Sequence, residues 1–490
     1  MDSDSPGETK LERLLPGLAP ADVVGDAQVV VRDLAYDART VSAGALFFCV
    51  PGARADGHDY APDAVARGAV GLVVERALDL PVVQVVVEDA RRAMGLAANV
   101  FFGLPTHELQ VAGVTGTNGK TTTAFLIHSV LDVAGRRPGL LGTVESRVGG
   151  VRRPVVRTTP EAIDLQRLFR EMLDAGDQSC AIEASSHASE LHRLEGVRFA
   201  ALVFTNLTQD HLDFHGTIER YYEAKRRLFV EGERPPAAVN IGDPHGRLLA
   251  AELRRLRHGR LLTYGFSGDA DLVPQDLQIT ASGARFRAGG LDLLTSLRGR
   301  FNVENVLAAV AAGRLLGVND DAIAAGVAAL EGVPGRFEAI DEGQSFAVVV
   351  DYAHTPDSLQ NVLRAARDLA ESRVVCVFGC GGDRDRGKRS LMGRLARDLA
   401  DIAIVTSDNP RSEDPLAIID EILTGADGDL DVEPDRGTAI TRALELADKG
   451  DVVVIAGKGH EQGQELGDRK LFWDDRHAAR HVLRRLGAAR

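Results

Sequence analysis

A glycine-rich segment at residues 115–122 is the part of this sequence that most directly suggests chemistry; it reads Thr-Gly-Thr-Asn-Gly-Lys-Thr-Thr. It follows an apolar run that predicts a strand over residues 111–114, and it opens a helix predicted over 121–134. Glycines let backbone N–H groups approach phosphates, and a helix N-terminus favours negative charge. In such a loop Lys120 would reach the outer phosphates and the Thr121 hydroxyl would hold Mg²⁺. A strict P-loop has Gly where position 114 is Val, but the strand–loop–helix context favours a phosphate loop over a chance turn.

A second candidate is Glu183, which follows a strand predicted over residues 179–182 and precedes the polar cluster Ser185, Ser186 and His187. A carboxylate at the end of a strand near a phosphate loop is well placed to bind Mg²⁺. A solvated glutamate at a strand end is the alternative. The adjoining Ser-Ser-His favours the functional interpretation, because the end of a core strand would not need it.

A third candidate region follows the strand predicted over residues 200–205. His211, in Asp-His-Leu-Asp-Phe-His-Gly at 210–216, could bind a metal or polarise a phosphate, although a lone loop histidine is usually solvated. Thr217 then predicts a helix start, with Tyr221 and Lys225 on one face of that helix. Lysines on amphipathic helices usually lie at the surface, so the pattern alone gives Lys225 no role.

Bulk properties bound the class of protein. A length of 490 residues suggests about three domains. A net charge of −14 argues against a general nucleic-acid or membrane binder, while it allows a local basic pocket. The cysteines, Cys49, Cys180, Cys376 and Cys380, fit a reducing compartment, and no second pair completes a zinc site beside the last two. The acidic N-terminus and the absence of an apolar run of about 18–20 residues predict a cytoplasmic protein without membrane insertion.

The organisation along the chain predicts α/β architecture. Residues 1–9 are expected to be disordered, and a compact segment with apolar runs at 45–50 and 70–74 extends to about 106. Strands and helices alternate from residue 109, and a second alternating block begins after Gly335. Its strands are predicted at 347–350, 374–378, 402–406 and 452–456, with helices at 357–369 and 438–447; an earlier helix is predicted at 307–316. Ligands of such an open sheet bind at the carboxyl ends of its strands.

Taken together, these segments resemble the Mur ligases of peptidoglycan synthesis. The matching motifs run in order from about Asp37 to Glu461. Besides the phosphate loop, Glu183 with Ser-Ser-His, and residues 206–216, they include Phe-Asn-Val-Glu-Asn at 301–305, Gly-Arg-Phe-Glu at 335–338, Asp-Tyr-Ala-His-Thr-Pro-Asp at 351–357 and Gly-Lys-Gly-His-Glu at 457–461. One such motif alone would be a weak signal, whereas the ordered set is specific.

The resemblance implies a three-domain α/β fold. Residues 1–106 would form a small UDP-sugar-binding domain, 107–334 a central P-loop ATPase domain with a parallel or mixed sheet, and 335–490 a Rossmann-like domain that binds an amino acid. It also implies a monomer that uses ATP and Mg²⁺. In the family the lysine matching Lys225 is carbamylated by CO₂, which would give an anionic oxygen ligand for a second Mg²⁺.

The resemblance further implies roles for particular residues. ATP would be bound by Gly116, Thr117, Asn118, Gly119, Lys120, Thr121, Thr122, Asn302, Asn305 and Arg336. Catalysis would involve Lys120, Glu183, His211 and Lys225, and metal would be held by Thr121, Glu183, His211 and the carbamate of Lys225. The nucleotide-linked precursor would contact Arg39, Thr158, Thr159, Ser186 and Arg193.

The choice of amino acid is expected to depend on residues 407–411, Ser-Asp-Asn-Pro-Arg, which resemble the family's form that selects meso-diaminopimelate. A guanidinium at Arg411 would bind the distal carboxylate of that substrate through paired, charge-assisted hydrogen bonds. Lysine lacks that carboxylate and would leave Arg411 unpaired. The full set of implied contacts is Arg384, Asp408, Asn409, Pro410, Arg411, Gly457 and Glu461.

Three positions depart from the family's pattern. Ala38 replaces a serine expected between Asp37 and Arg39, Leu191 stands where a glutamine is expected, and Glu145 stands where glycine is common. These departures concern contacts to the precursor rather than the ATP chemistry.

The expected activity is therefore the ATP-dependent addition of meso-diaminopimelate to the D-glutamate of UDP-N-acetylmuramoyl-L-alanyl-D-glutamate through an acyl phosphate. Three alternatives stay open: the same ligase using L-lysine, another amide ligase such as a folylpolyglutamate-type or the next Mur enzyme, and an NTP-driven switch or transport ATPase. Arg411 disfavours the first, and the Ser-Ser-His and Asp-Asn-Pro-Arg segments disfavour the others. Whether ATP turnover requires both precursor and amino acid separates these classes.

Overall fold

The computed structural model describes residues 8–52, 55–428 and 430–488. Residues 1–7, and with them most of the segment predicted to be disordered, lie outside these ranges; Thr9–Lys10 forms strand β1, so the prediction is wrong for Thr9. Within the described ranges, no helix is both long and apolar enough to cross a membrane. The chain divides into two compact units, the described parts of Met1–Thr115, Gly135–Leu202 and Ala224–Pro236, and those of Gly116–Ala134, Val203–Glu223 and Ala237–Arg490.

The N-terminal part of the first unit is a five-stranded sheet in the order β2-β7-β6-β5-β4. Its strands are β2 (Asp22–Val24), β4 (Asp33–Ala35), β5 (Ala45–Phe48), β6 (Gly71–Val74) and β7 (Val83–Val86). β4 to β7 are parallel and β2 is antiparallel to β7. Alternate residues of β5 face opposite cores, Leu46 and Phe48 toward α1 (Leu11–Leu18) and α3 (Ala90–Phe101), Phe47 toward α2 (Ala61–Ala66). Burial on both faces explains the continuous apolar runs in the sequence.

A mixed sheet in the order β11-β10-β9-β12-β8-β13-β14-β15 occupies the middle of the chain. Its strands are β8 (Gln110–Thr115), β9 (Pro138–Leu141), β10 (Ser146–Val148), β11 (Val151–Arg153), β12 (Ser179–Glu183), β13 (Phe199–Phe204), β14 (Ala237–Asn240) and β15 (Leu261–Tyr264). β12 is parallel to both β9 and β8, and Glu183 lies opposite Val114 in the β8 register. The last residue of β12 is thus beside the strand that leads into the phosphate loop.

The helices of this part confirm most of the sequence prediction. They are α4 (Lys120–Val133), α5 (Ala162–Asp174), α6 (Ser186–Glu190), α7 (Leu212–His215), α8 (Ile218–Val230), α9 (Pro244–Arg255), α10 (Arg300–Leu315) and α11 (Asp320–Ala329). α10 begins at Arg300, not at residue 307, so Asn302 and Asn305 lie on its first turns. An antiparallel sheet of β16 (Gln275–Thr280), β17 (Gly283–Ala288) and β18 (Leu291–Thr295) was not predicted. The alternation of apolar and polar residues over 284–293 and the Gly-Gly pair at 289–290 are the sequence signals that would have found it.

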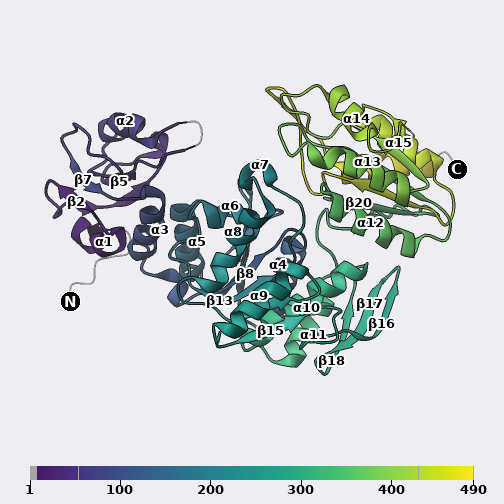
Figure 1. Cartoon of the computed structure of the whole chain (residues 1–490), viewed down its shortest axis with the longest axis horizontal. Helices are drawn as coiled ribbons and strands as arrows, with labels where there is room; N and C mark the ends of the chain where they lie inside the picture. The colour runs from purple at the N-terminus through teal and green to yellow at the C-terminus, as the bar shows by residue number, and fades with distance from the viewer. Residues whose placement is uncertain (1–7, 53–54, 429, 489–490) are drawn as a thin grey trace. The chain divides into compact units, whose positions relative to one another are not determined.

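The C-terminal sheet, green to yellow in Figure 1, has the order β19-β20-β24-β21-β22-β23. Its strands are β19 (Glu338–Ala339), β20 (Ala347–Asp351), β21 (Val374–Phe378), β22 (Ile402–Val405), β23 (Asp431–Val432) and β24 (Val452–Ala456). All are parallel except β19. Helices α12 (Pro356–Leu369), α13 (Gly387–Leu399) and α14 (Pro415–Leu423) cover one face, and α15 (Arg436–Leu446) and α16 (Asp475–Ala488) the other. β24, β21 and β22 are neighbours in the sheet and run parallel. The loops that follow them therefore lie side by side at the carboxyl edge of the sheet.

Candidate active site

The phosphate loop has a backbone that requires glycine at two positions. Gly116 (φ +147°) and Gly119 (φ +87°) adopt conformations that side chains disfavour. A Cβ on Gly116 would lie 1.9 Å from the hydroxyl oxygen of Thr205, and one on Gly119 would lie 2.4 Å from Oδ1 of Asn305. Gly119 also caps α4, whose first N–H groups have no preceding carbonyl in the helix to bind. The strand–loop–helix geometry of an anion-binding loop is therefore present as predicted.

Residues at the end of β13 hold this loop in place. The backbone N–H groups of Thr117 and Asn118 donate to the carbonyl and to Oδ1 of Asn206, at 2.9 and 2.8 Å. The Thr205 hydroxyl donates to the carbonyl of Asn118 at 2.6 Å. These bonds consume two of the loop's N–H groups, so the first turn of α4 supplies those that remain for a phosphate.

Lys120 folds back over the loop that precedes it. Its Nζ lies 2.9 Å from the carbonyl oxygen of Gly116 and 2.7 Å from that of Thr117. The ammonium thus already lies over the loop carbonyls, and the buried residues Thr121 and Thr122 follow Lys120 in the first turn of α4. A phosphate bound in the loop would offer this ammonium a stronger, charged partner than two carbonyls.

Three further residues expected at ATP lie against the same loop. Oδ1 of Asn305 accepts from the Thr123 hydroxyl at 3.3 Å, and its Nδ2 donates to Oδ1 of Asn302 at 2.9 Å. Arg336 donates from Nη2 to the Thr121 hydroxyl at 3.0 Å. The structure therefore brings Asn302, Asn305 and Arg336 to the phosphate loop, although each is far from it in sequence.

His211 is held by the carboxylate next to it in sequence. Its Nε2 lies 3.3 Å from Oδ2 of Asp210, and its ring meets Tyr221 edge to face with centroids 6.0 Å apart. The hydroxyl of Tyr221 is 3.1 Å from that of Thr117, which links this segment to the phosphate loop. Burial alone would raise the pKa of Asp210, but the charge of His211 and of other nearby cations brings it to about 2. Asp210 is a site residue to which the sequence assigned no role.

Glu183 is 1% exposed, so the alternative of a solvated glutamate is wrong. Its Oε1 accepts from the backbone N–H of Thr143 at 2.7 Å and its Oε2 from the Thr143 hydroxyl at 3.1 Å. The Thr159 hydroxyl donates to the Glu183 carbonyl at 2.7 Å, and the hydroxyls of Thr158 and Thr143 are 3.1 Å apart. Thr158 and Thr159 therefore gather at the end of β12. Ser186, in the first turn of α6, is buried there as well.

Three arginines surround one buried carboxylate in the first unit. Oε1 of Glu161 lies 2.9 Å from Nη2 of Arg193 and 3.0 Å from Nη1 of Arg157, and its Oε2 lies 3.3 Å from Nη1 of Arg91. Arg193 also donates to the carbonyl of Thr159 at 3.3 Å. Because three guanidiniums face a single carboxylate, the cluster keeps excess positive charge and suits an anion. The sequence identified Arg193 alone, since the other two carry no motif.

Lys225 is 1% exposed on α8, so its interpretation as a surface lysine is wrong. Tyr221, one turn earlier, is also buried, which confirms that the two share an inward face. Among the described residues, no group of three or more His, Cys, Asp or Glu side chains is arranged to hold a metal ion.

Arg39 is paired with Asp37, which lines a cavity of the N-terminal sheet. It is 85% exposed, and its Nε and Nη2 donate to Oδ1 and Oδ2 of Asp37 at 2.9 and 2.6 Å. The cavity has a volume of about 280 Å³ and is lined by Asp33, Leu34, Ala35, Tyr36, Asp37, Thr40, Ile163, Asp164 and Arg167.

The structure also places the three residues that depart from the family pattern. Ala38 is buried, Leu191 follows the last residue of α6, and Glu145 pairs with Arg147 and Arg152.

The segment expected to choose the amino acid lies at the carboxyl edge of the C-terminal sheet, directly after β22. Asp408 and Asn409 are buried there. A Cβ on Gly457, which has φ +118°, would lie 2.5 Å from Oδ2 of Asp408, so only glycine allows this approach. The loop after β21 reaches the same place, because a Cβ on Gly382 would lie 2.0 Å from the Pro410 carbonyl oxygen. The Arg384 side chain of that loop is exposed and donates to its neighbour Asp383.

Arg411 is not free in this segment. Its Nε donates to Oε2 of Glu465 at 2.9 Å and its Nη1 to the carbonyl of Gly382 at 2.7 Å. Glu465 belongs to a hairpin of β25 (Gln464–Leu466) and β26 (Arg469–Leu471). The expectation that a lysine substrate would leave Arg411 unpaired is therefore wrong, because Glu465 already supplies a carboxylate.

Family models match three consecutive parts of the chain. They are described as "Mur ligase family, catalytic domain" over residues 31–101, "Mur ligase middle domain" over 114–313 and "Mur ligase, glutamate ligase domain" over 335–459. The chain belongs to the Mur ligase family. It has that family's three-domain α/β fold, as the sequence predicted.

This Mur ligase is similar over nearly its whole length to curated relatives. The UDP-N-acetylmuramoyl-L-alanyl-D-glutamate–2,6-diaminopimelate ligase of Solibacter usitatus is 48% identical over 491 residues, which cover 98% of this chain and 97% of that protein. The enzyme of the same name from Geobacillus kaustophilus is 46% identical, with 94% and 96% covered. A solved structure of a ligase with this name has a TM-score of 0.70 at 33% identity and covers 98% of this chain and 99% of its own.

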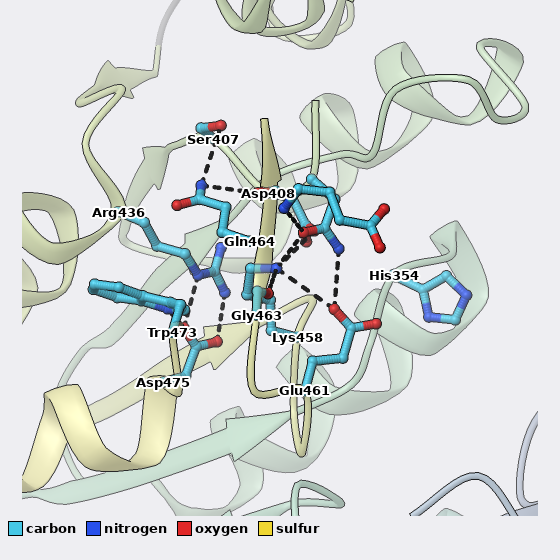
Figure 2. Close-up of polar contacts among 12 residues, drawn as sticks. His354, Ser407, Asp408, Arg436, Lys458, Glu461, Gly463, Gln464, Trp473 and Asp475 are labelled. Atoms are coloured by element: carbon cyan, nitrogen blue, oxygen red, sulfur yellow. Dashed lines mark hydrogen bonds and ion pairs between the residues drawn. The ribbon is translucent and has the colours of Figure 1, made fainter. Parts of the chain in front are cut away.

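The Mur ligase contains site residues that the sequence reasoning missed. Lys458 is completely buried, and Figure 2 shows it between Gly463 and Glu461. Asn409 accepts from Lys458 and donates to Glu461. In the motif Gly-Lys-Gly-His-Glu at 457–461, the family resemblance implies contacts for Gly457 and Glu461 only. The sequence signal for Lys458 is a lysine between two glycines directly after an apolar strand, where a long charged side chain is not expected.

Proposed function

We propose that this Mur ligase joins meso-diaminopimelate to the D-glutamate of UDP-N-acetylmuramoyl-L-alanyl-D-glutamate and converts ATP to ADP and phosphate. The observation that carries the proposal is the similarity, at up to 48% identity over almost the full length, to ligases of that name. Asp408, Asn409 and Arg411, at one edge of the C-terminal sheet, support it, because they offer a carboxylate, an amide and a guanidinium to a substrate with two amino-acid ends.

The proposed division of labour follows the three matched segments. Residues 1–106 would bind the UDP-sugar, 107–334 would bind ATP, and 335–490 would bind the amino acid. The three arginines around Glu161 support a role in binding the anionic precursor, since they add Arg91 and Arg157 to the expected Arg193. Thr158, Thr159 and Ser186 would assist from the end of β12, and Arg39 from the N-terminal sheet.

ATP would be bound by the phosphate loop. The N–H groups of the first turn of α4 and the ammonium of Lys120 would bind its phosphates. Asn302 and Asn305 would support the loop, and Arg336 would bring further positive charge to Thr121. His211 would donate to a phosphate oxygen, with Asp210 fixing its ring.

The residues proposed to hold Mg²⁺ fit its preference for oxygen. Thr121 offers a hydroxyl and Glu183 a buried carboxylate. Magnesium keeps several waters and takes other ligands from phosphates, so a large cluster of acidic side chains is not needed. Bound Mg²⁺ would neutralise charge on the transferring phosphate. The imidazole of His211, a nitrogen donor, suits a phosphate oxygen better than this metal.

Lys225 is proposed to carry a carbamate. Its neutral amine would attack CO₂ to form an N–C bond and lose a proton, which turns the side chain into an anion with two oxygens. The burial of Lys225 supports a role inside the fold rather than at the surface. The carbamate would then add oxygen ligands of the kind that Mg²⁺ prefers.

The proposed reaction has two steps. The side-chain carboxylate of the precursor's D-glutamate attacks the γ-phosphorus of ATP, and ADP leaves. The amine of meso-diaminopimelate then attacks the carbonyl carbon of this acyl phosphate, and phosphate leaves as the amide forms. The enzyme needs no nucleophile of its own, so its side chains position the reactants and balance charge.

L-lysine remains the second candidate substrate. The pairing of Arg411 with Glu465 favours keeping it, because a lysine side chain would not leave the guanidinium without a partner. The test is incubation of the full chain with ATP, the UDP-linked dipeptide and each of a panel of amino acids, followed by product mass and phosphate release. The proposal requires a product of diaminopimelate mass and phosphate release that depends on both precursor and amino acid. Phosphate release without either substrate would support an NTP-driven switch or transporter instead.

A further inference from the structure

Lys458 is a charged side chain with no exposed surface, enclosed beneath the segment proposed to bind the amino acid. Its Nζ donates to Oδ1 of Asn409 at 2.7 Å and to the carbonyl of Gly463 at 2.8 Å (Figure 2). Two carboxylates also lie close, with Oε2 of Glu461 at 3.5 Å and Oδ1 of Asp408 at 3.6 Å. Burying an ammonium is costly unless it is fully paired, so this arrangement has a structural cost that a purely apolar core would avoid.

The first consequence of this placement is a fixed orientation of the Asn409 amide. Its Oδ1 accepts from Lys458 and from the backbone N–H of Glu465 at 3.0 Å, so the oxygen must face inward. Its Nδ2 donates to Oε2 of Glu461 at 3.0 Å. The amide nitrogen carries two hydrogens, and a flipped amide would set them against two donors. Lys458 and the Glu465 N–H together hold the amide with its nitrogen toward Glu461.

The second consequence concerns the charges of Asp408 and Glu461. Burial raises the pKa of Glu461, and the charge of Asp408 raises it further. Burial also opposes ionisation of Asp408, but Lys458 and then Arg436 hold its pKa below the ordinary value. A cation beside two neighbouring carboxylates favours the ionised form of both. Lys458 is such a cation: it lies within 3.6 Å of both carboxylates, and its charge lowers the pKa of each beside the place proposed for a substrate ammonium.

The strand that precedes Lys458, β24, is held at its end by a buried ion pair. Arg436 and Asp475 form a buried pair, Nε to Oδ1 at 2.7 Å and Nη2 to Oδ2 at 2.6 Å, and Trp473 donates to the same carboxylate at 2.8 Å (Figure 2). Arg436 also donates to the carbonyl of Ala456 at 2.9 Å, the last residue of β24. Because this carbonyl is two residues before Lys458, the pair fixes the backbone from which the lysine extends.

We propose that Lys458 is a positioning residue for the amino-acid substrate. It orients the Asn409 amide and balances Asp408 and Glu461, so that the site presents N–H donors and anionic oxygens together. That combination suits a substrate end carrying both a carboxylate and an ammonium. The inference rests on the proposed function, since it assigns these contacts to the amino acid rather than to ATP or the precursor.

The test compares Lys458→Met, which removes both charge and donor, with Lys458→Gln, which keeps a donor for Asn409 but no charge. The matched control is Arg373→Met. Arg373 pairs at 2.7 Å with the buried Asp451 at the opposite, amino-terminal edge of the same sheet, so its loss also leaves a buried carboxylate unpaired. Steady-state kinetics with each substrate varied in turn gives KM for meso-diaminopimelate, ATP and the UDP-linked dipeptide, and thermal unfolding gives Tm.

Lys458→Met is expected to raise KM for meso-diaminopimelate about 10- to 100-fold, the scale of losing a charged hydrogen bond, and to leave the other two KM values within about threefold. Lys458→Gln should fall between wild type and Lys458→Met, and it supplies the measurement if the methionine variant does not fold. Arg373→Met should lower Tm without a selective change in any KM. If both Lys458 variants lowered Tm as Arg373→Met does and left KM for diaminopimelate unchanged, Lys458 would be structural only. If wild type formed no diaminopimelate product, the proposed function would fall first and this inference with it.

Discussion

Arg411 and Glu465 form an ion pair in which the guanidinium is held from two sides, by Oε2 of Glu465 at Nε and by the carbonyl of Gly382 at Nη1. The backbone of Arg411 is left-handed (φ +53°), a conformation that costs a non-glycine residue free energy. Its N–H donates to the Glu465 carbonyl at 3.1 Å, and its own carbonyl accepts from Gly467 at 2.7 Å. The β25–β26 hairpin thus fixes both the backbone and the side chain of Arg411 before any substrate binds, which lowers the entropy lost on binding.

Replacing Arg411 by alanine is expected to weaken binding of diaminopimelate selectively. Loss of one partner of a hydrogen-bonded charge pair typically costs about 2–5 kcal/mol, or roughly 30- to 5,000-fold. Arg411 is partly exposed, so the lower end applies and KM for diaminopimelate should rise about 30-fold. Arg411→Lys should also bind weakly, because an ammonium cannot reproduce the fork of a guanidinium. Kinetics with each of the three substrates varied measures the effect.

The control for this variant is Arg442→Ala, which removes an exposed arginine that pairs with Asp431 on the surface of the same domain. It should leave all three KM values within about twofold, as surface substitutions usually do. Equal changes in all three KM values for Arg411→Ala, or no change, would remove Arg411 from the amino-acid site and reopen the choice of substrate.

Glu465 should have a much smaller effect than Arg411, because its side chain is 42% exposed and surface ion pairs contribute little. Glu465→Ala removes the acceptor at Nε and should raise KM for diaminopimelate by about two- to fivefold. Glu465→Gln keeps an acceptor of the same shape and should stay close to wild type. If both variants instead lowered this KM, Glu465 would be a competitor for Arg411 rather than a support, and the two substitutions together decide between these roles.

Lys120→Ala should abolish phosphate release, since it removes the charge that balances the γ-phosphate. The expected loss in kcat is at least about 100-fold, the scale of removing one group that stabilises developing charge. Lys449→Ala, at an exposed position in the C-terminal part, serves as the control and should be fully active. Substantial turnover by Lys120→Ala would contradict the assignment of residues 115–122 as a phosphate loop.

Lys225→Ala should be nearly inactive, and short carboxylates added to the assay should restore part of its activity. A carboxylate can occupy the place of the carbamate and supply the same oxygens to Mg²⁺. Intact-protein mass measured under mild conditions should show the added CO₂ on wild type and not on the variant. Activity like that of wild type, with no response to carboxylates, would leave Lys225 a buried structural lysine.

Glu304 should make stability depend on pH. Burial raises its pKa to about 7, against the attraction of Arg300. Below the unfolded pKa of 4.5 both states are protonated; as pH rises toward 7 the unfolded state ionises first, so folding stability falls. At about 1.4 kcal/mol per unit the loss is about 1–3 kcal/mol, given that Glu304 keeps some solvent contact. Glu304→Gln cannot ionise, so its free energy of unfolding should exceed that of wild type increasingly from pH 5 to 8; urea titrations with parallel pH profiles would contradict the assignment.

Much of the fold was predictable, because its signals are local. The strands at 374–378 and 452–456 have the predicted bounds, since fully buried parallel strands read as short apolar runs between turn residues. The antiparallel β16–β18 sheet was missed because its strands are half exposed and mix polar with apolar residues. Helix α10 was placed too late because its first turns carry polar residues that face the phosphate loop rather than a core.

By itself the sequence determined the glycine-rich loop between a strand and a helix, because the backbone at positions 116 and 119 requires glycine. It determined the family through the ordered set of motifs from about Asp37 to Glu461. Tertiary structure alone decided which charges meet. Arg411 and Glu465 are 54 positions apart, Asn409 and Lys458 are 49 apart, and Arg91 and Glu161 are 70 apart. Such pairs follow from the insertion of β24 between β20 and β21 and from the packing of distant segments, and no periodicity in the chain encodes them. The burial of Glu183 and Lys225 was likewise decided by the tertiary structure, because exposure depends on neighbours that only the folded chain supplies.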